Sequence, residues 1–477
     1  MWCLSFSSRA FSDDASEKNG ALEQRRRPTA EPNARAAMSL PSTASAAIRD
    51  VLSVHFDVVL DDLASLPLPP HRRHPGGGPG GARFVGGGKH AVRVVTLNHN
   101  DTVGDALAKL SRHRILSAPV MIQPDVLDAD CMNHRRAYGA DPDARVEPAT
   151  LLGFFDVADA SRALARQLPA DDAADGAKPR PPCRNVLSWM KTLETIEKRV
   201  TTQTLIQVLG DDAELMYQAS ARYGTLFEAI RDGFLGKYSP SHGVTHRIAI
   251  FDESGEIVRV VSMSDVVRYL TSKVDALGGI GKTSIKTLGL CKEKPLGLVT
   301  VKPTTPAIEA FAEMCEEPVS GVGVVDDDDE LIANLSASDL RCIQPEHFGM
   351  LGLPTAEFLA LLHGTSYSGF SHAVSASKDN PFFAKMSEGG FRRSGPLLIV
   401  ARPTDAFEEV LNKIVEHGVH RVYVCEPESM RPRGVVTLTD ILAFVADAAE
   451  GAAGEGREGA PLFTEDEKPK EAYTKAE

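Results

Sequence analysis

The sequence predicts a mixed fold of the α/β (α+β) class, in which four similar units pair into two modules with long loops and disordered termini. Three observations lead to this prediction. A helix, two short strands and a second helix follow one another near the end of the chain, this order recurs at three earlier places, and each unit closes with an Asp after its second strand. These aspartates stand at positions 159, 265, 339 and 440, so the intervals are 106, 74 and 101 residues. Because the spacing is uneven, it excludes a solenoid of fixed period and favours four units with insertions.

The fourth unit shows the pattern most clearly. Apolar residues repeat at helical spacing between Thr404, which is expected to cap the first helix, and Gly418, which is expected to end it. Residues 422–424 and 434–438 have the apolar, β-branched composition of two short strands. Thr439 is expected to cap the closing helix.

The other three units repeat this order with larger interruptions. In the third unit the expected elements are a helix at 307–315 and strands at 319–325 and from 333. In the second unit they are strands at 244–251 and from 259 and a helix at 266–270. In the first unit they are a helix at 103–110 and strands at 117–122 and from 153. A small sheet of this kind cannot bury both faces alone, so pairing within each module is expected to complete the core.

Several residues of the fourth unit carry a resemblance to a known family. His420 and Arg421 open its first strand, and Gly434, Thr437 and Asp440 mark the end of its second. This pattern resembles the cystathionine-β-synthase (CBS) domain. Four such repeats in one chain resemble the gamma, nucleotide-sensing subunit of AMP-activated/SNF-type protein kinases, especially the plant and algal forms, and the residues 304–306 (Thr-Thr-Pro) that open the third unit are also gamma-like.

The resemblance covers residues 93–446 and implies a domain plan of two Bateman modules. The implied segments are a first module at 48–275, with CBS repeats at about 93–166 and 198–273, and a second at 276–448, with repeats at about 295–345 and 396–447. It also implies a non-catalytic regulatory subunit that senses AMP, ADP or ATP, needs no other cofactor, and joins an alpha-type kinase catalytic subunit and a beta-type scaffold subunit. Its expected location is the cytoplasm or the nucleus rather than an organelle.

The alternative function is a stand-alone CBS-domain protein that acts as a docking scaffold or regulates another partner. Asp440 and the two His-Arg pairs count against this alternative, and the altered first unit counts for it. A catalytic function ranks third, because the repeats use the folded length and no catalytic motif set appears.

Aspartates at the strand-to-helix junctions are candidate ribose ligands. A carboxylate in this place can accept hydrogen bonds from a ribose diol, as the acidic residue of dinucleotide-binding folds does. A single such Asp is better explained by favourable interactions with the free N–H groups and dipole at a helix N-terminus. Recurrence in four units favours the ribose role for Asp265, Asp339 and Asp440.

Two pairs of consecutive residues, His246-Arg247 and His420-Arg421, are candidate phosphate ligands. Arg offers a two-pronged donor to phosphate, and His adds a donor whose charge depends on pH. Either pair alone would be explained by a solvated strand end, but the recurrence in units two and four favours phosphate contact. Units one and three have Ser117-Ala118 and Ser320-Gly321 instead, so they are expected to supply adenine and ribose contacts. The complete predicted nucleotide site is His246, Arg247, Ser262, Asp265, Val319, Ser320, Ser336, Asp339, His420, Arg421, Thr437 and Asp440.

Three substitutions depart from the family pattern. Asp156 replaces the hydroxyl found at Ser262, Ser336 and Thr437, and a second carboxylate there would repel a phosphate, so the first unit is not expected to hold a nucleotide. Arg259 and Ala333 replace the glycine that stands at Gly153 and Gly434.

Residues 276–283 nearly match a P-loop, which needs a preceding buried strand. Here a helix precedes them, so we expect an inter-module linker and no ATPase site.

The composition excludes several classes of partner and site. With 43% hydrophobic and 25% charged residues and no long apolar run, the chain is expected to be soluble and to need no membrane. Its net charge of −13 argues against non-specific nucleic-acid binding. Seven scattered cysteines without a CxxC pair support neither a disulfide framework nor a metal site, so no metal is expected.

The regions outside the repeats are expected to be disordered or looped, with one exception. Disorder is predicted at 1–47 and 449–477, a flexible linker at 67–88, and loops at 124–148 and 168–182. Residues 47–63 have the apolar spacing of a helix that docks on the first module. The insertion at 344–395 is either functional or disordered.

Overall fold

The computed structural model describes residues 40, 42–66, 94–113, 115–121, 151–168, 185–209, 224–236, 244–251, 257–291, 298–317, 319–342, 345–363 and 398–454. The described residues from 42 onward belong to one compact unit. The predictions for residues 1–39, 67–88, 124–148, 169–182, 364–395 and 455–477 lie outside the described residues.

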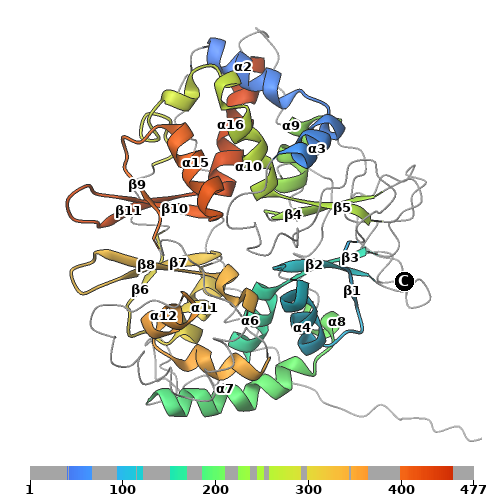
Figure 1. Cartoon of the computed structure of the whole chain (residues 1–477), viewed down its shortest axis with the longest axis vertical. Helices are drawn as coiled ribbons and strands as arrows, with labels where there is room; N and C mark the ends of the chain where they lie inside the picture. The colour runs from blue at the N-terminus through green and yellow to red at the C-terminus, as the bar shows by residue number, and fades with distance from the viewer. Residues whose placement is uncertain are drawn as a thin grey trace, which may run out of the picture. The chain divides into compact units, whose positions relative to one another are not determined.

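Four antiparallel hairpins form the framework, as the repeat pattern predicted (Figure 1). They are β2 (Ser117–Met121) with β3 (Leu151–Asp156), β4 (Arg247–Phe251) with β5 (Ile257–Ser262), β7 (Gly321–Val325) with β8 (Leu331–Ser336), and β10 (Arg421–Cys425) with β11 (Pro432–Thr437). Each hairpin has one register shift, between the fourth and fifth residues of its first strand. The shared register shows that the four hairpins are structural repeats, and it allows equivalent residues to be matched.

Three of the hairpins gain a short parallel strand at one edge. These strands are β1 (Leu97–Asn98), β6 (Thr300–Val301) and β9 (Val400–Ala401), and each pairs with the first strand of its hairpin. In the described part of unit two the sheet contains β4 and β5 alone.

A helix precedes and another follows each hairpin. The preceding helices are α4 (Val103–His113), α9 (Leu226–Glu228) with the π-helical turn η4 (Ala229–Phe234), α11 (Ala307–Glu316) and α15 (Phe407–His417). The following helices are α6 (Val157–Arg166), α10 (Met263–Ser272), the 3-10 segment η7 (Ala337–Cys342) and α16 (Leu438–Gly454). The predicted order of helix, strand, strand and helix is therefore present in every unit.

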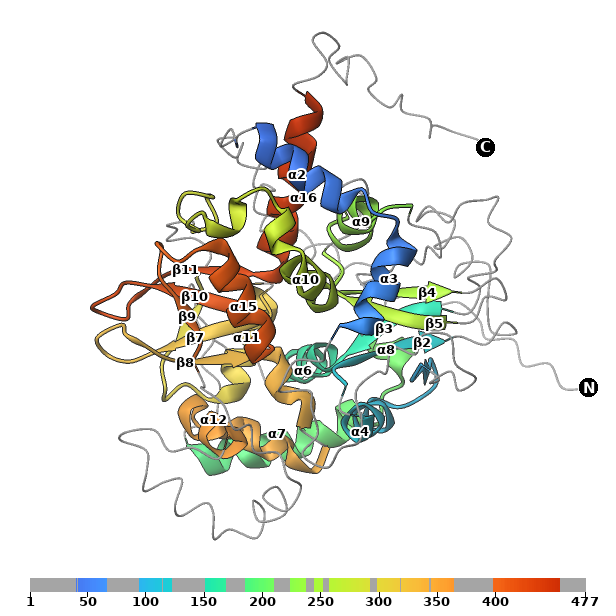
Figure 2. The same cartoon turned by 45° about the horizontal axis from the view of Figure 1, so that its top comes forward.

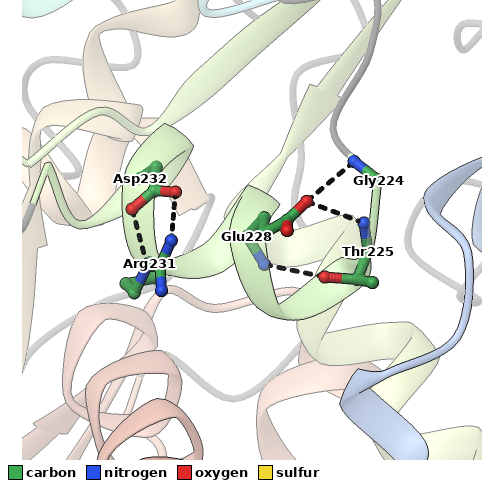
Figure 3. A network of polar contacts seen from close by, with 5 residues as sticks. All are labelled: Gly224, Thr225, Glu228, Arg231 and Asp232. Carbon is green, nitrogen blue, oxygen red and sulfur yellow. Dashed lines mark hydrogen bonds and ion pairs between the residues drawn. The ribbon is translucent and has the colours of Figure 1, made fainter.

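Helix α9 begins with a reciprocal capping box, in which side chains at both ends of the first turn bind the opposite backbone N–H (Figure 3). The Thr225 hydroxyl accepts from the Glu228 backbone N–H at 3.2 Å, and Glu228 Oε2 accepts from the backbone N–H groups of Gly224 and Thr225 at 2.9 and 3.2 Å. One turn later, Arg231 donates to both carboxylate oxygens of Asp232, each at 2.7 Å.

Two predicted helix caps in unit four were wrong by two residues. Helix α15 begins at Phe407 after Ala406, whose backbone N–H donates to Glu409 Oε2 at 3.1 Å, so Thr404 is not the cap. The hydroxyl of Thr437 accepts from the Asp440 backbone N–H at 3.2 Å and caps α16, which leaves Thr439 inside the first turn. Gly418 ends α15 in the left-handed conformation, with φ of 62°, as predicted.

Packing within a module brings hairpins together, whereas packing between modules brings helices together (Figures 1 and 2). In the second module the Tyr423 hydroxyl donates to Asn334 Oδ1 at 3.0 Å, and the Leu331 backbone N–H donates to the Met430 carbonyl at 3.1 Å. Between modules, α6 of unit one packs on α11 and η7 of unit three, and α10 of unit two packs on α15 and α16 of unit four.

A large core cluster joins unit one to unit three. It includes Phe155 and Leu164 from unit one and Phe311 and Phe358 from the unit-three side. Residues of units three and four share a smaller cluster between their hairpins, made of Val325, Leu331, Tyr423 and Cys425. The prediction that pairing within a module completes the core is therefore incomplete, because apolar helix faces are buried across the module boundary as well.

Additional helices cover the end of this core. Helix α7 (Val186–Thr201) lies along the 3-10 segment η8 (Pro345–Gly352), near α8 (Leu205–Leu209) and α12 (Thr355–His363). Phe348 and Phe358, on η8 and α12, are 5% and 0% exposed. The first part of the predicted insertion is thus neither a functional loop nor disordered, since it belongs to the hydrophobic core.

Two N-terminal helices, α2 (Ser42–Leu52) and α3 (Phe56–Ser65), pack on units two and four. Helix α3 packs on α10 of unit two, as docking on the first module requires, but α2 packs on α16 of unit four, and Arg49 Nη2 donates to the Ala449 carbonyl at 3.3 Å. The prediction that this segment docks on the first module was therefore incomplete, because α2 packs on the second module as well. Helix α2 also begins before residue 48, the predicted start of the first module, and α16 extends past residue 448, the predicted end of the second.

The segment that resembles a P-loop is a connector. It follows helix α10 and contains two short 3-10 turns, η5 (Val274–Ala276) and η6 (Ile280–Lys282), so it lacks the preceding strand of a true P-loop. Its Thr283 carbonyl accepts from the Phe407 backbone N–H at 2.9 Å, which ties the connector to α15. The linker prediction is confirmed. Within the described ranges, every helix is too short or too polar to cross a membrane.

Candidate functional site

The strand-to-helix junctions of the four units can be superposed residue by residue from their backbone hydrogen bonds. In each, a carbonyl just before the first strand accepts from the first N–H of the closing helix. The acceptor-donor pairs are Leu116 with Val157, His246 with Met263, Ser320 with Ala337, and His420 with Leu438, at 2.9, 3.1, 3.0 and 3.2 Å.

This superposition corrects one predicted equivalence. In unit one the His-Arg pair corresponds to Leu116-Ser117, one residue before the predicted Ser117-Ala118. In unit three it corresponds to Ser320-Gly321, as predicted. The first position of the pair is therefore apolar in unit one and a hydroxyl in unit three.

The register also aligns the second strands. Asp156, Ser262, Ser336 and Thr437 lie opposite Ser117, Arg247, Gly321 and Arg421, respectively. Each is the last residue of its strand and precedes the closing helix. Asp156 is therefore the structural counterpart of the three hydroxyl residues, as the sequence indicated.

All four junction aspartates take part in capping their own helices. Asp159, Asp265, Asp339 and Asp440 each accept, through Oδ2, the backbone N–H three residues earlier, at 2.7, 3.1, 2.8 and 3.0 Å. Asp265 and Asp440 also accept from the hydroxyls of Ser262 and Thr437, both at 2.7 Å. The local capping role that the sequence left as an alternative is thus present in every unit.

The second carboxylate oxygen differs between these aspartates. Oδ1 of Asp159 lies 3.1 Å from Arg162, and Oδ1 of Asp265 lies 3.5 Å from Arg268. Among the described residues, Asp440 forms no ion pair. No cation pairs with its second oxygen among the described residues, so the ribose role of Asp440 stays a prediction compatible with the cap.

The two arginines of the predicted phosphate site have different surroundings. Arg247 Nη1 donates to Asp156 Oδ2 at 2.8 Å, across the interface of units one and two, and both side chains keep partial exposure. Arg421 is 7% exposed and donates through Nη2 to the Ser320 hydroxyl at 2.5 Å, across the interface of units three and four. One arginine is thus neutralised by a carboxylate, whereas the other is buried against a hydroxyl.

A glycine makes room for the buried arginine. A Cβ on Gly321 would overlap the Arg421 guanidinium and lie 2.8 Å from the Leu335 carbonyl. Burial lowers the pKa of Arg421, and its hydrogen bond with Tyr423 and the charge of Asp339 oppose that shift. Burial likewise raises the pKa of Tyr423 to about 12, against the effect of Arg421.

Arg421 Nε has no hydrogen-bond partner among the described residues. A buried cation with an unused donor is costly unless an anion completes its contacts.

His246 lies within electrostatic reach of both modules. It keeps accessible surface, yet the atoms around it remove part of its hydration. This desolvation lowers the pKa of His246, Arg247 and Arg421 lower it further, and Asp156 opposes them. The geometric evidence that units two and four adjoin is the packing of α10 on α15 and α16.

The starts of the two closing helices also meet. The hydroxyl of Thr439, in the first turn of α16, lies 3.8 Å from the sulfur of Met263, which begins α10. The closing helices of units two and four therefore begin beside each other, and a common site formed by Asp440, His420, Arg421 and His246 stays a prediction.

The remaining predicted residues fill supporting positions. Val319 packs partly buried against the core, Ser320 receives the Arg421 hydrogen bond, and half-buried His420 accepts from Leu438 through its carbonyl. The buried Asp339 contributes negative charge near Arg421.

Sequence reasoning missed Tyr423 and Asn334. Strand periodicity offered a signal for Tyr423, since residues two apart face the same side and Tyr423 follows Arg421 by two.

Arg259 replaces the glycine of the family pattern for a structural reason. Its Nη1 donates to the Leu60 carbonyl at 2.7 Å, and nearby Arg268 donates to the Leu63 carbonyl at 3.4 Å. These arginines bind carbonyls in the second half of α3, and Leu63 is one of its last four residues, whose carbonyls have no donor within the helix. Among the residues that the structure describes, no group of three or more His, Cys, Asp or Glu could hold a metal ion.

Comparison with known proteins supports the repeat assignment. The CBS domain model matches residues 295–344 and 397–447, which correspond to units three and four. The chain is 26% identical over 198 residues to the SNF1-related protein kinase regulatory subunit gamma-1-like of Arabidopsis thaliana, covering 40% of this chain and 39% of that protein. It is 25% identical over 200 residues to Protein sds23 of Neosartorya fischeri, covering 41% of this chain and 33% of that protein.

The match therefore spans only about two fifths or less of each curated relative. Among solved structures, protein MJ1225 from Methanocaldococcus jannaschii, described as a putative archaeal homolog of g-AMPK, aligns with 74% of this chain and 97% of its own, at 13% identity and a TM-score of 0.42. The CBS domain model thus matches units three and four, units one and two share their hairpin register, and part of the chain is similar to the Arabidopsis SNF1-related kinase regulatory subunit gamma-1-like.

Proposed function

We propose that this chain is a non-catalytic regulatory subunit that binds AMP, ADP or ATP between its CBS units and reports nucleotide state to an SNF1/AMP-activated-type kinase. The observation that carries the proposal is the buried Arg421, which has an unused Nε donor among the described residues and lies near His246 of the other module. A phosphate would add a hydrogen-bonded anion to the negative charge that Asp339 already supplies near Arg421, because arginine binds phosphate through parallel charge-assisted hydrogen bonds.

The ribose and phosphate would be bound by different elements. Asp440, at the start of α16, offers its second oxygen to the ribose, and the hydroxyls of Thr437 and Ser336 lie at equivalent junctions beside the phosphate. Arg421 and His246 would take the phosphate charge, with Ser320 and His420 beside them.

Nucleotide state would be transmitted through the contacts between modules. AMP and ATP differ in phosphate charge, so they would stabilise the paired positions of Arg421 and His246 to different extents. Helices α10, α15 and α16 pack across the module boundary directly behind these residues. A ligand that favours one arrangement of these helices would shift the population and change the surface offered to a kinase.

Similarity to a protein named as a kinase regulatory subunit supports the choice of partners. The expected complex contains an alpha-type catalytic subunit and a beta-type scaffold subunit. The altered first unit, in which Asp156 neutralises Arg247, favours the second candidate, a stand-alone CBS-domain regulator of another partner.

Purification of the tagged full chain from its native cells distinguishes the two candidates. The proposal predicts that mass spectrometry finds a kinase catalytic subunit and a scaffold subunit in near-equal amounts, with an adenine nucleotide released on denaturation. Absence of kinase subunits from a preparation that contains other specific partners would replace the kinase proposal with the stand-alone regulator.

A further inference from the structure

The two modules differ at one equivalent position in a way that affects phosphate binding. Asp156 ends β3 in unit one, and its counterpart in unit three is Ser336. Each lies in the odd-numbered unit of its module, facing the unit that contributes the arginine. The first module therefore carries an additional negative charge at the place where the second carries a neutral hydroxyl.

The two oxygens of Asp156 have separate partners. Oδ1 accepts from the Ala158 backbone N–H at 3.0 Å and caps α6, whereas Oδ2 accepts from Arg247 Nη1 at 2.8 Å. Capping needs only one acceptor, since Ser262 and Thr437 cap their helices through hydroxyls. The carboxylate is thus unnecessary for the cap, and its distinguishing contact is the ion pair with Arg247.

We infer that Asp156 is an internal counter-anion that occupies Arg247 and excludes phosphate groups from it. An arginine bound to a carboxylate at hydrogen-bond distance must break that contact before it can bind a phosphate, and the carboxylate repels the incoming anion. The same charge acts on His246, whose pKa it raises against the effects of both arginines. This inference deepens the proposed function, on which it rests, by assigning the arginine contact with phosphate to Arg421 of the second module.

Substitution of Asp156 can remove the charge while keeping the cap. Asp156→Asn keeps the size and an acceptor oxygen, and Asp156→Ser reproduces the residue of units two and three. Asp159→Asn is the matched control, because Asp159 lies in the same capping box but pairs with Arg162. The double variant Asp156→Asn with Arg247→Gln tests whether any gain depends on Arg247.

Calorimetric titration of the full chain with inorganic pyrophosphate and with ADP tests the inference, after circular dichroism has confirmed folding. We expect Asp156→Asn and Asp156→Ser to bind pyrophosphate roughly tenfold or more tightly than the original chain. We also expect an additional ADP-binding event. Both gains should disappear in the double variant and be absent from Asp159→Asn.

Each result decides between the proposals. Folded Asp156 variants whose pyrophosphate and ADP titrations match the original chain would overturn the inference, even if that chain binds ADP. If the original chain binds no ADP but Asp156→Asn gains pyrophosphate binding through Arg247, the proposed nucleotide function fails and the masking of Arg247 stands. If no variant binds either probe, both are overturned.

Discussion

At the scale of single residues, the junction aspartates show how a capping side chain can keep an acceptor oxygen for a ligand. Asp440 uses Oδ2 for the cap of α16, hydrogen-bonding to both the N–H and the hydroxyl of Thr437. A carboxylate has two oxygens and several lone pairs, so a capping role leaves room for a ligand. Capping therefore explains why an Asp stands in every unit, but it does not explain why Asp440 lacks the cation partner that Asp159 and Asp265 have among the described residues.

Substitution of Asp440 by Asn tests the ribose role. The amide keeps one acceptor for the cap, so the free energy of unfolding should fall by about 1 kcal/mol or less. Loss of a charged acceptor for the ribose should weaken ADP binding by roughly tenfold. Calorimetry and chemical denaturation measure the two effects.

Asp159→Asn is the matched control for this change, since it removes an equivalent capping carboxylate to which no ribose role is assigned. Equal losses of ADP affinity in the two variants, or none in either, would contradict the ribose role of Asp440.

The lowered pKa of His246 predicts a dependence on pH with a definite sign. The folded chain binds a proton at His246 less readily than the unfolded chain, whose His titrates at about 6.5. The contribution of His246 to stability is therefore complete above about pH 6.5 and is lost as the pH falls towards the lowered folded pKa. Denaturation curves measured across this range should show that loss, and His246→Gln should remove it.

Phosphate binding should reverse the shift at His246. Negative charge beside the ring favours its protonated form, so binding takes up a proton and ADP affinity should rise from about pH 8 to about pH 6. The phosphate itself titrates in this range, and the comparison with His246→Gln isolates the contribution of the ring. Identical pH profiles for both proteins would show that His246 does not contact the phosphate.

At the scale of secondary-structure elements, β7 is shaped by the arginine of a neighbouring strand. Gly321→Ala would place a methyl group against the Arg421 guanidinium and 2.8 Å from the Leu335 carbonyl, which is backbone and moves little. We expect a loss of about 1–3 kcal/mol in stability and a weaker ADP interaction, because the guanidinium must move.

Gly323→Ala, on the same strand, provides the control. Its Cβ would meet side-chain atoms of Leu331, Thr300 and Tyr423, at 2.9, 3.4 and 3.4 Å, and these can give way. It should cost less stability and leave ADP affinity nearly unchanged. A Gly321→Ala protein with the stability and ADP affinity of the original chain would contradict the placement of Arg421.

Helix α3 makes a second element-scale prediction. Leu63 is 1% exposed on its inner face, whereas Val58 is 50% exposed on the outer face. Leu63→Ala should lower the free energy of unfolding by about 2–5 kcal/mol through the cavity it leaves, and Val58→Ala should change it by about 0.5 kcal/mol or less. Similar losses in both would show that α3 is not packed on unit two as described.

The elements were more predictable than their ends. Periodicity indicated every hairpin and most flanking helices, because alternation and helical spacing depend on local burial. The caps at Thr404 and Thr439 were misplaced because several hydroxyl residues adjoin each helix, and only backbone geometry selects one. Helix α7 was missed, although its buried residues Trp189, Leu193, Ile196 and Val200 follow helical spacing.

The candidate site was predictable in composition but not in contacts. Recurrence of His-Arg and Asp in the repeats identified the residue types, whereas their partners depend on chain segments far apart. Arg247 and Asp156 are separated by 91 residues, and Arg421 and Ser320 by 101. No local pattern indicates that one arginine meets a carboxylate and the other a hydroxyl.

At the scale of the whole molecule, the four units are interdependent. Apolar helix faces of unit one and unit three share a core cluster, and α2 joins α16 near the end of the described chain. A separated module would expose these faces to water. For this reason the two modules are best regarded as one folded unit, in which the ligand proposed at Arg421 and His246 would act on both.

The central claim is that the chain binds an adenine nucleotide through Arg421 and does not turn it over. Calorimetric titration of the folded full chain and of its Arg421→Gln variant with AMP, ADP and ATP, combined with a phosphate-release assay, tests it directly. We predict saturable binding of at least one nucleotide, a roughly ten- to hundredfold loss of affinity in the variant, and no release of phosphate. Unchanged affinity in a folded Arg421→Gln protein, or ATP hydrolysis that Lys282→Ala abolishes, would contradict the claim.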